Sequence, residues 1–224
     1  MNKHKSHTKI KASGLNARKV KRIFDRLEAL YPAAHCELEH KSPFELLIAT
    51  ILSAQCTDKR VNMVTPALFE VASSPEKMLQ LGEVGLSSYI QSCGLYQSKA
   101  KNIIATCRLL LEKYDGAIPP SRAELVQLPG VGRKTANVVL YNAFAIPTIA
   151  VDTHVFRVSR RIGLAQGQNV NTVEKELMAN IPKKRWGEAH HLMIFHGRYC
   201  FTARAPQCSR CPITRDCAYF QVQQ

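Results

Sequence analysis

Residues Leu128-Pro129-Gly130-Val131-Gly132-Arg133-Lys134-Thr135-Ala136-Asn137-Val138-Val139-Leu140 form a turn with proline and glycine that runs directly into an apolar helical segment. Pro129 disfavours continuation of a preceding helix, and glycines permit backbone conformations closed to other residues. The first amide groups of the following helix have no partner within it, so they suit an anion such as phosphate. A helix–turn–helix corner with glycines for packing alone fits the same pattern. The hairpin by itself leaves both interpretations open.

The remaining sequence predicts helices throughout. Apolar residues recur at helical spacing, and no convincing alternating strand or β-hairpin turn is evident, so we expect an all-α fold of roughly ten helices joined by short loops. Ser42 and Ser74 precede prolines and early glutamates, as helix N-caps do, and Ser121 and Glu124 have the spacing of a capping box. Outside the hairpin, the expected helices cover about 16–31, 44–54, 59–72, a short stretch from 75, 84–92, 100–114, 121–128, a stretch from 151, 172–180 and 185–197.

The charge balance points to a polyanionic partner. The chain of 224 residues has 31 Lys and Arg against 17 Asp and Glu, a formal charge of 31 − 17 = +14. Such a surplus favours nucleic acid first and an acidic membrane surface second. The sequence has no apolar run of about 18 residues and no signal-peptide pattern, so we expect a cytoplasmic protein. Residues 1–13 are rich in Lys and His and are interpreted as a flexible basic tail.

Four of the eight cysteines are concentrated near the end of the chain, in the pattern Cys200-x7-Cys208-x2-Cys211-x5-Cys217. Clustered cysteines in a reducing compartment usually bind metal, and thiolates at these spacings suit either a zinc ion or an iron–sulfur cluster. Only one close C-x2-C pair is present, whereas structural zinc more often uses two. The wide loop favours a cluster over a single ion, with zinc as the alternative.

Several motifs in a fixed order resemble the bacterial endonuclease III family, which comprises bifunctional DNA glycosylase/abasic-site lyases of the helix-hairpin-helix superfamily. The hairpin at 128–134 is followed by Val151-Asp152-Thr153-His154, by His196-Gly197-Arg198-Tyr199 and by the four cysteines. Upstream, Ser42-Pro43-Phe44-Glu45-Leu46-Leu47-Ile48, Leu52-Ser53-Ala54-Gln55 and Gly94-Leu95-Tyr96 also match. The resemblance covers nearly everything from Ser42 to Cys217, and the combination is far more specific than the hairpin alone.

The resemblance implies two helical domains with DNA bound in the cleft between them. Residues 36–146 are expected to form a six-helix barrel that carries the hairpin. Residues 1–35 and 147–224 are expected to form the second domain, with a [4Fe–4S] cluster held by Cys200, Cys208, Cys211 and Cys217. The implied partner is double-stranded DNA with a damaged base or an abasic site. The implied protein is a nucleoid-associated monomer without membrane attachment.

One departure from the family pattern affects the cysteine loop. Family members usually have six residues between the first two cysteines, with one residue between Arg-Tyr and the first cysteine. Here Cys200 directly follows Tyr199, Phe201 occupies the usual cysteine place, and the gap is seven residues. A one-residue bulge in the loop would accommodate the longer gap between Cys200 and Cys208. The departure bears on Cys200 alone among the four expected ligands.

Two residues match the catalytic positions of the family. Lys134 matches the amine nucleophile that attacks the sugar C1′ and forms a Schiff base. The amine must be neutral to react, and both the helix N-terminus and adjacent Arg133 disfavour its charged form. The alternative for Lys134 is a phosphate-binding or solvated lysine. Asp152 matches the carboxylate that stabilises positive charge on the sugar and assists deprotonation; an aspartate at a helix start is also a common N-cap, and the two roles are compatible.

The resemblance also assigns DNA contacts. Gln55 and Leu95 lie on the turns where family members place the residues that fill the gap left by a flipped-out nucleotide. Loop polarity for Gln55 and core packing for Leu95 are the alternatives. Gly130 and Gly132 would hold backbone phosphate through their amides without reading sequence. A fourth set, His154, His190, His191 and His196, has no recognised metal-ligand spacing, so packing and hydrogen bonding are the favoured interpretation.

Two other functions fit parts of the sequence. An adenine-specific mismatch glycosylase of the same superfamily is similar but lacks the lysine at the position of Lys134 and carries a further C-terminal domain. A non-enzymatic helix-hairpin-helix DNA-binding module explains the charge and the hairpin, but not Asp152 or the cysteine loop. We therefore predict a base excision repair enzyme that removes oxidised pyrimidines, a substrate range implied by the family alone.

Overall fold

The computed structural model describes residues 15–223, and over this range the chain contains helices and no strand. The all-α prediction is therefore confirmed. The predicted basic tail at 1–13 lies outside the described residues. The chain divides into two compact units, one formed by residues 36–150 and the other by the segments up to His35 and from Val151. None of the described helices is long and apolar enough to cross a membrane.

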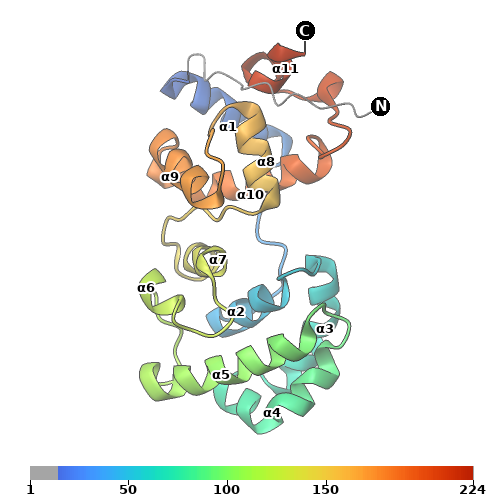
Figure 1. Cartoon of the computed structure of the whole chain (residues 1–224), viewed down its shortest axis with the longest axis vertical. Helices are drawn as coiled ribbons and strands as arrows, with labels where there is room; N and C mark the ends of the chain where they lie inside the picture. Colours follow the sequence, from blue (N-terminus) through green and yellow to red (C-terminus); the bar gives the residue numbers. More distant parts are fainter. Residues whose placement is uncertain (1–14, 224) are drawn as a thin grey trace, which may run out of the picture. The chain divides into compact units, whose positions relative to one another are not determined.

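The unit of residues 36–150 has six α-helices around one apolar core (Figure 1), namely α2 (Pro43–Leu52), α3 (Asp58–Val71), α4 (Pro75–Ile90), α5 (Tyr96–Tyr114), α6 (Arg122–Leu125) and α7 (Arg133–Phe144). Helix α2 is buried along almost its whole length, as its apolar sequence predicts, and packs against α3, α5 and α7. Ser42 caps it as expected, since its hydroxyl accepts a hydrogen bond from the Glu45 amide at 3.2 Å.

The helix expected at 121–128 was wrong in its cap and its length, whereas the two helices expected between 75 and 92 are present. Ser121 makes no side-chain cap, and α6 is only four residues long, because the chain leaves the helix through tight i→i+3 bonds from Gln127 and Leu128 to Glu124 and Leu125. The range labelled α4 consists of two helices that meet at a kink, where Gly82 has non-helical backbone angles with φ 70°. A residue with positive φ cannot continue a right-handed helix, so the short helix from 75 and the separate helix at 84–92 are present as expected.

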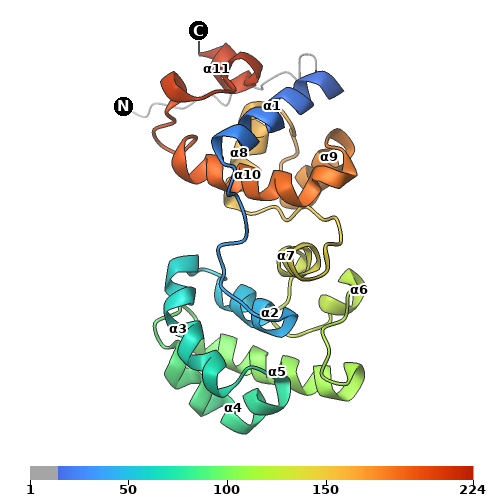
Figure 2. The same ribbon diagram turned by 180° about the vertical axis from the view of Figure 1, so that it is seen from behind.

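The other unit contains α1 (Ala17–Leu30), α8 (Thr153–Ile162), α9 (Val170–Asn180), η1 (Lys183–Arg185), α10 (Trp186–Tyr199), η2 (Cys208–Arg210), η3 (Thr214–Asp216) and α11 (Ala218–Val222). Helix α10 packs against both α1 and α8, and Figure 2 shows α1 beside α10. The apolar stripe of α1, predicted from its helical spacing, is buried at Val20, Ile23, Phe24 and Leu27. The short helical turns after α10 were not expected from sequence.

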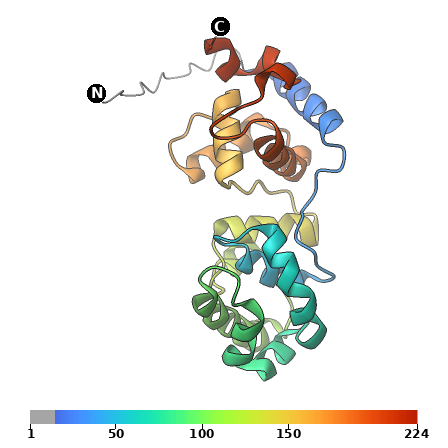
Figure 3. The ribbon, with the colours of Figure 1, turned by 90° about the vertical axis from the view of Figure 1, so that its right-hand side faces the viewer.

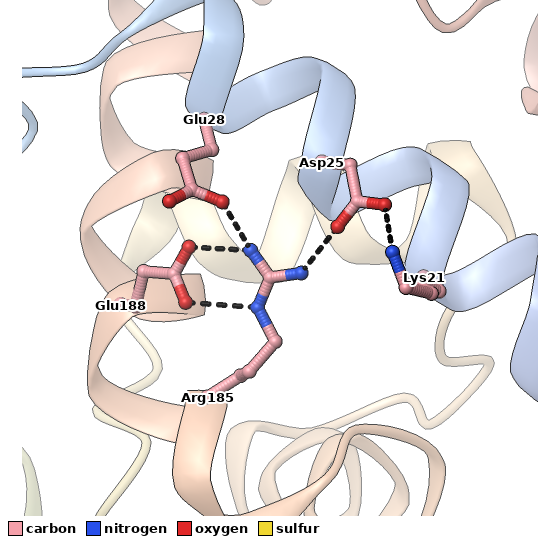
Figure 4. Close-up of polar contacts among 5 residues, drawn as sticks. All are labelled: Lys21, Asp25, Glu28, Arg185 and Glu188. Atoms are coloured by element: carbon pink, nitrogen blue, oxygen red, sulfur yellow. Dashed lines mark hydrogen bonds and ion pairs between the residues drawn. The ribbon is translucent and has the colours of Figure 1, made fainter.

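An arginine joins α1 to the segment that opens α10 (Figure 4). Arg185 donates to Asp25 at 2.8 Å, to Glu28 at 2.9 Å and to both carboxylate oxygens of Glu188, and only 16% of its side chain is exposed. Its guanidinium also lies over the ring of Phe24, 5.8 Å from the ring centroid. Bidentate pairing of this kind fixes orientation as well as charge. The N-terminal helix is thereby attached to a segment about 160 residues further along the chain.

Candidate active site and metal centre

The turn between α6 and α7 is built by backbone conformation and fastened to α5. Gly130 has φ +78°, which L-residues rarely adopt, while the Val131 amide bonds the Leu128 carbonyl at 3.0 Å. Leu128 and Val131 are buried in the core of this unit. From α5, the Thr106 hydroxyl donates to the Pro129 carbonyl at 2.8 Å. The hairpin is therefore a rigid feature that presents the start of α7.

Lys134 lies in the first turn of α7 and is exposed. The N-cap is Gly132, which supplies no side-chain acceptor to the amides of that turn, so the helix start keeps its ability to bind an anion. Lys134 also lies close enough to Cys36 for its charge to favour the Cys36 thiolate; burial nevertheless dominates and raises the pKa of that thiol. Exposure and position make the amine accessible to a ligand.

The first half of α7 is hydrogen-bonded to the segment that leads to Asp152. The Asn137 side-chain amide donates to the Ile149 carbonyl at 3.0 Å, and the Thr148 hydroxyl donates to the Asn137 carbonyl at 2.6 Å. Asn137 is 1% exposed, and its Oδ1 has no hydrogen-bond partner. Asn137, which lies in the stretch 128–140, thus fastens residues 148 and 149 to α7. The apolar residues on either side of Asn137 do not indicate this role.

Asp152 is the N-cap of α8 and belongs to the other unit. Its Oδ1 accepts a hydrogen bond from the Val155 amide at 2.7 Å, so the capping role considered from sequence is present. The side chain is half-buried, and its charge raises the pKa of nearby Arg157, although burial lowers that pKa overall. Because Oδ1 caps α8, a catalytic role of Asp152 would use its other carboxylate oxygen, Oδ2.

The two turns expected to contact DNA share an unusual backbone. Gln55 has φ 54° and Leu95 has φ 59°, so both adopt the left-handed conformation that costs a non-glycine residue energy and often marks functional sites. Leu95 is 59% exposed and Gln55 is exposed, which contradicts the alternative that Leu95 belongs to the core. The turns adjoin, since a Cβ built on Gly94 would lie 3.2 Å from the Gln55 carbonyl oxygen.

A buried lysine supports the first of these turns. Lys99 is only 5% exposed and donates through Nζ to the carbonyl of Leu52, the last residue of α2, at 2.7 Å. Burial lowers its pKa, while the neighbouring Cys56 and Cys93 act in the opposite direction. No sequence pattern around Lys99 indicates that this lysine satisfies the carbonyl at a helix end.

All four clustered cysteines line one small pocket, together with Phe201, Gln207, Thr214 and Phe220. Figure 3 shows the segment after α10 looping back beside α1. Cys200 Sγ lies 3.7 Å from the Gln207 carbonyl and Cys217 Sγ lies 3.9 Å from the Arg161 carbonyl. Four thiols around one cavity fit a metal centre, and a metal site is consistent with this arrangement.

His196 joins this site. Within residues 15–223, the group of metal-compatible side chains consists of His196, Cys200 and Cys211, whose ligand atoms lie within 4.8 Å of one another. The ring is fully buried, with Nδ1 3.3 Å from the Tyr31 hydroxyl and Nε2 3.7 Å from Cys211 Sγ. Burial lowers the His196 pKa to about 4 and raises that of Cys211 to about 12. Of the four histidines, His196 therefore lies among the metal-compatible side chains. The other three pack or hydrogen-bond as expected: His154 Nδ1 lies 3.3 Å from the Arg157 guanidinium, and the rings of His190 and His191 are 5.0 Å apart.

Cys200 and Phe201 both line the pocket, and the Phe201 side chain also packs among aromatic rings. Phe201 is 4% exposed, and its ring lies 5.3 Å from that of Tyr219 and 5.8 Å from that of His196. The guanidinium of Arg161 lies 5.4 Å from its centroid. The Phe201 amide bonds the His196 carbonyl at 2.6 Å, which tightens the chain immediately after α10.

Comparison with known proteins gives a consistent result. Residues 48–183 match the HhH-GPD superfamily of base excision DNA repair proteins. The chain is 53% identical over 206 residues to endonuclease III of Rickettsia prowazekii and 52% identical over 205 residues to that of Escherichia coli K12, in each case covering 92% of this chain and 97% of the relative.

Solved structures agree with these relatives. A non-covalent endonuclease III–DNA complex and a trapped endonuclease III–DNA covalent intermediate each have a TM-score of 0.88 and 48% identity, covering 94% of this chain and 99% of theirs. A thermostable thymine-DNA glycosylase, at 21% identity and a TM-score of 0.82, shares the fold.

Proposed function

The chain belongs to the endonuclease III family of the HhH-GPD superfamily, and on this premise we propose that it is a bifunctional DNA N-glycosylase and abasic-site lyase of base excision repair. Its substrate is double-stranded DNA that contains an oxidised pyrimidine or an abasic site. The observation that carries the proposal is Lys134, an exposed amine in the first turn of a helix that begins at a rigid glycine hairpin. A non-enzymatic DNA-binding module has no need of this amine.

The proposed assignment of regions follows the two units. Residues 36–146 form the helix-hairpin-helix domain, and residues 1–35 with 147–224 form the metal-containing domain. DNA phosphate is held by the backbone at Gly130 and Gly132, supported by the uncapped start of α7. Gln55 and Leu95 enter the duplex when the damaged nucleotide is flipped out, a step that costs a few kcal/mol. Their exposure on adjoining left-handed turns supports this role.

The chemistry begins when the Lys134 amine attacks C1′ of the flipped nucleotide. The C1′–N bond breaks and the base leaves with the bonding electrons. The nitrogen lone pair of the resulting adduct then expels O4′, which takes up a proton, so the sugar ring opens to a Schiff base between Lys134 and C1′. Asp152 accepts a proton from the attacking group and stabilises positive charge on the sugar through its non-capping oxygen. Removal of a C2′ proton then expels the 3′ phosphate by β-elimination, and hydrolysis of the remaining imine releases the enzyme.

We further propose that the metal centre is a [4Fe–4S] cluster held by Cys200, Cys208, Cys211 and Cys217. The four thiols line one pocket, and the single close cysteine pair fits a cluster better than zinc. The bound cluster would cross-link a segment with little regular structure. Iron and acid-labile sulfide in the purified protein, together with broad visible absorbance, are the expected observations; zinc as the sole bound metal contradicts the proposal.

Borohydride trapping on duplexes containing an abasic site, thymine glycol or uracil tests the enzymatic proposal. A covalent protein–DNA adduct is expected with the wild type, and Lys134→Ala should reduce adduct formation and strand cleavage by at least about 1,000-fold, because the nucleophile is removed. A wild-type protein that forms no adduct contradicts the lyase assignment.

Asp152→Asn separates capping from catalysis. Asparagine is as good an N-cap as aspartate, so the thermal stability should be retained while trapping slows by about 100-fold or more. Asp152→Ala should lose both stability, by about 1 kcal/mol, and activity. An asparagine variant with unchanged trapping leaves Asp152 with the capping role alone.

A further inference from the structure

Each of the two exposed DNA-facing turns is adjacent to a cysteine. Cys56 follows Gln55, and Cys93 precedes Gly94 and Leu95. The backbone at both cysteines is fixed at a helix end, since the Cys56 amide bonds the Ser53 carbonyl at 3.1 Å and the Cys93 amide bonds the Ile90 carbonyl at 2.9 Å. The close approach of Gly94 to the Gln55 carbonyl brings these helix ends together.

The two cysteines flank turns that adjoin, since a Cβ built on Gly94 would lie 3.2 Å from the Gln55 carbonyl oxygen. Cys93 is 1% exposed, whereas Cys56 is half-buried and can be reached from solvent. A disulfide requires an S–S separation of about 2.05 Å and closely approaching Cβ atoms, so its two cysteines must lie on neighbouring segments, as these adjoining turns do. The pair lies outside the cysteine loop and serves no step of the proposed chemistry.

The surroundings distinguish the two sulfurs. Burial raises the pKa of Cys93 to about 11, with the Cys56 side chain acting in the same direction and the cationic Lys99 and Arg60 acting against it. Cys93 is therefore a poor first nucleophile, because the thiolate is the reactive form. The more exposed Cys56 is suited to react first, with Cys93 positioned to complete the exchange.

We propose that Cys56 and Cys93 form a reversible oxidation site that closes to a disulfide across the two turns. The oxidant is a low-molecular-weight disulfide of the glutathione class. The Cys56 thiolate attacks one sulfur of the oxidant and expels one thiolate, giving a mixed disulfide; the Cys93 thiolate then attacks the Cys56 sulfur and expels the second. The protein pair loses two electrons and two protons, and one oxidant molecule is reduced to two thiols.

Closing the bond draws together turns whose tips carry Gln55 and Leu95. Both residues already occupy a restricted left-handed conformation, so a small displacement beneath them changes what they present to DNA. Misplacement by about 1 Å can cost about 100-fold in rate. We expect the oxidised protein to release a damaged base at least about tenfold more slowly. This consequence rests on the proposed function, whereas formation of the disulfide does not.

Peptide mapping of the metal-loaded full chain tests the site. The protein is treated with oxidised glutathione, free thiols are alkylated, and tryptic peptides are analysed by mass spectrometry. The expected product is the Cys56 peptide joined to the Cys93 peptide, two hydrogen atoms lighter than their sum. Cys56→Ser should abolish it, and Cys36→Ser, which alters another half-buried thiol, should leave it intact. Recovery of Cys56 and Cys93 as separate peptides at saturating oxidant overturns the proposal.

Single-turnover base release from a thymine-glycol duplex measures the consequence. The wild type should slow on oxidation and recover with dithiothreitol, and Cys56→Ser should show no response to oxidant. A linked peptide with an unchanged release rate overturns the effect on the turns. If the reduced protein releases no base at all, the proposed function fails while the mapping result stands, so the two failures are distinguishable.

Discussion

The hairpin at 128–134 and the cysteine loop at 200–217 are both short irregular segments, yet different forces hold them. The hairpin is anchored by buried Leu128 and Val131 and by the hydrogen bond from Thr106. Its shape depends on the left-handed conformation of Gly130. Apolar burial and backbone bonding of this kind are little affected by charge or by bound metal.

The cysteine loop is attached mainly by arginines from other elements. Arg161 of α8 donates to the carbonyls of Thr202 and Ala203 at 3.0 and 2.9 Å, and Arg22 of α1 pairs with Asp216 through two hydrogen bonds. Its regular structure is limited to the short turns η2 and η3. Such a loop should depend on charge and on its ligands, whereas the hairpin should not.

Removal of the metal should produce the largest difference between the two regions. A structural metal can contribute on the order of 10 kcal/mol, so chelation should expose the loop to trypsin at Arg204, Arg210 and Arg215. Hydrogen exchange in α7 and the hairpin should stay unchanged, because their core is separate. Peptide-resolved hydrogen exchange before and after chelation measures the protection of the cysteine loop and of the hairpin with α7. Equal loss of protection in the two regions would contradict the comparison.

Asp216→Asn should have the next largest effect. The Asp216 carboxylate is 3% exposed and accepts from Arg22, so loss of its charge should destabilise the loop by about 2 kcal/mol, measured as a shift in loop hydrogen exchange. Asp25→Asn is the matched control, because that carboxylate is 42% exposed although it is also paired with an arginine. Its effect should be smaller than 1 kcal/mol.

The same pair predicts a pH dependence. The hydrogen bond from Arg22 lowers the pKa of Asp216 below its ordinary value of 3.8. A carboxylate whose pKa is lower in the folded state stabilises that state fully above the ordinary value, and the contribution is lost as pH falls through the folded value. Loop protection should therefore fall below about pH 4 in the wild type, and Asp216→Asn should lack this component.

These contrasts also explain what the sequence could predict. Helical spacing identified the buried stripe of α1 and the buried length of α2, since both follow from local periodicity. The supports of the cysteine loop could not be found this way, because Arg22 and Asp216 are 194 residues apart and each resembles an ordinary surface charge in sequence. Lys99 and Asn137 were missed for the same reason: their partners are backbone carbonyls, which no sequence pattern marks.

Gly130→Ala tests whether the hairpin depends on backbone conformation. A Cβ at this position, with φ +78°, would lie 3.1 Å from Asn102 Cβ, so the substitution should destabilise the protein by about 1–2 kcal/mol. Gly132→Ala is the matched control for stability, because Gly132 has φ −88° and a Cβ there meets nothing within 4 Å. Its cost should be within about 0.5 kcal/mol. Urea denaturation compares them, and similar costs for the two variants would contradict the conformational explanation.

The smallest effect separates two serines that look alike in sequence. Ser42 and Ser121 both precede a helix with a glutamate three residues later, but only the Ser42 hydroxyl accepts a hydrogen bond from the first turn. Ser42→Ala should therefore cost about 1 kcal/mol, whereas Ser121→Ala should cost close to nothing. Both serines belong to the unit of the hairpin, so neither effect should change with metal content. A Ser121→Ala cost equal to that of Ser42→Ala would mean that the cap forms in solution and that the four-residue α6 is longer than the structure describes.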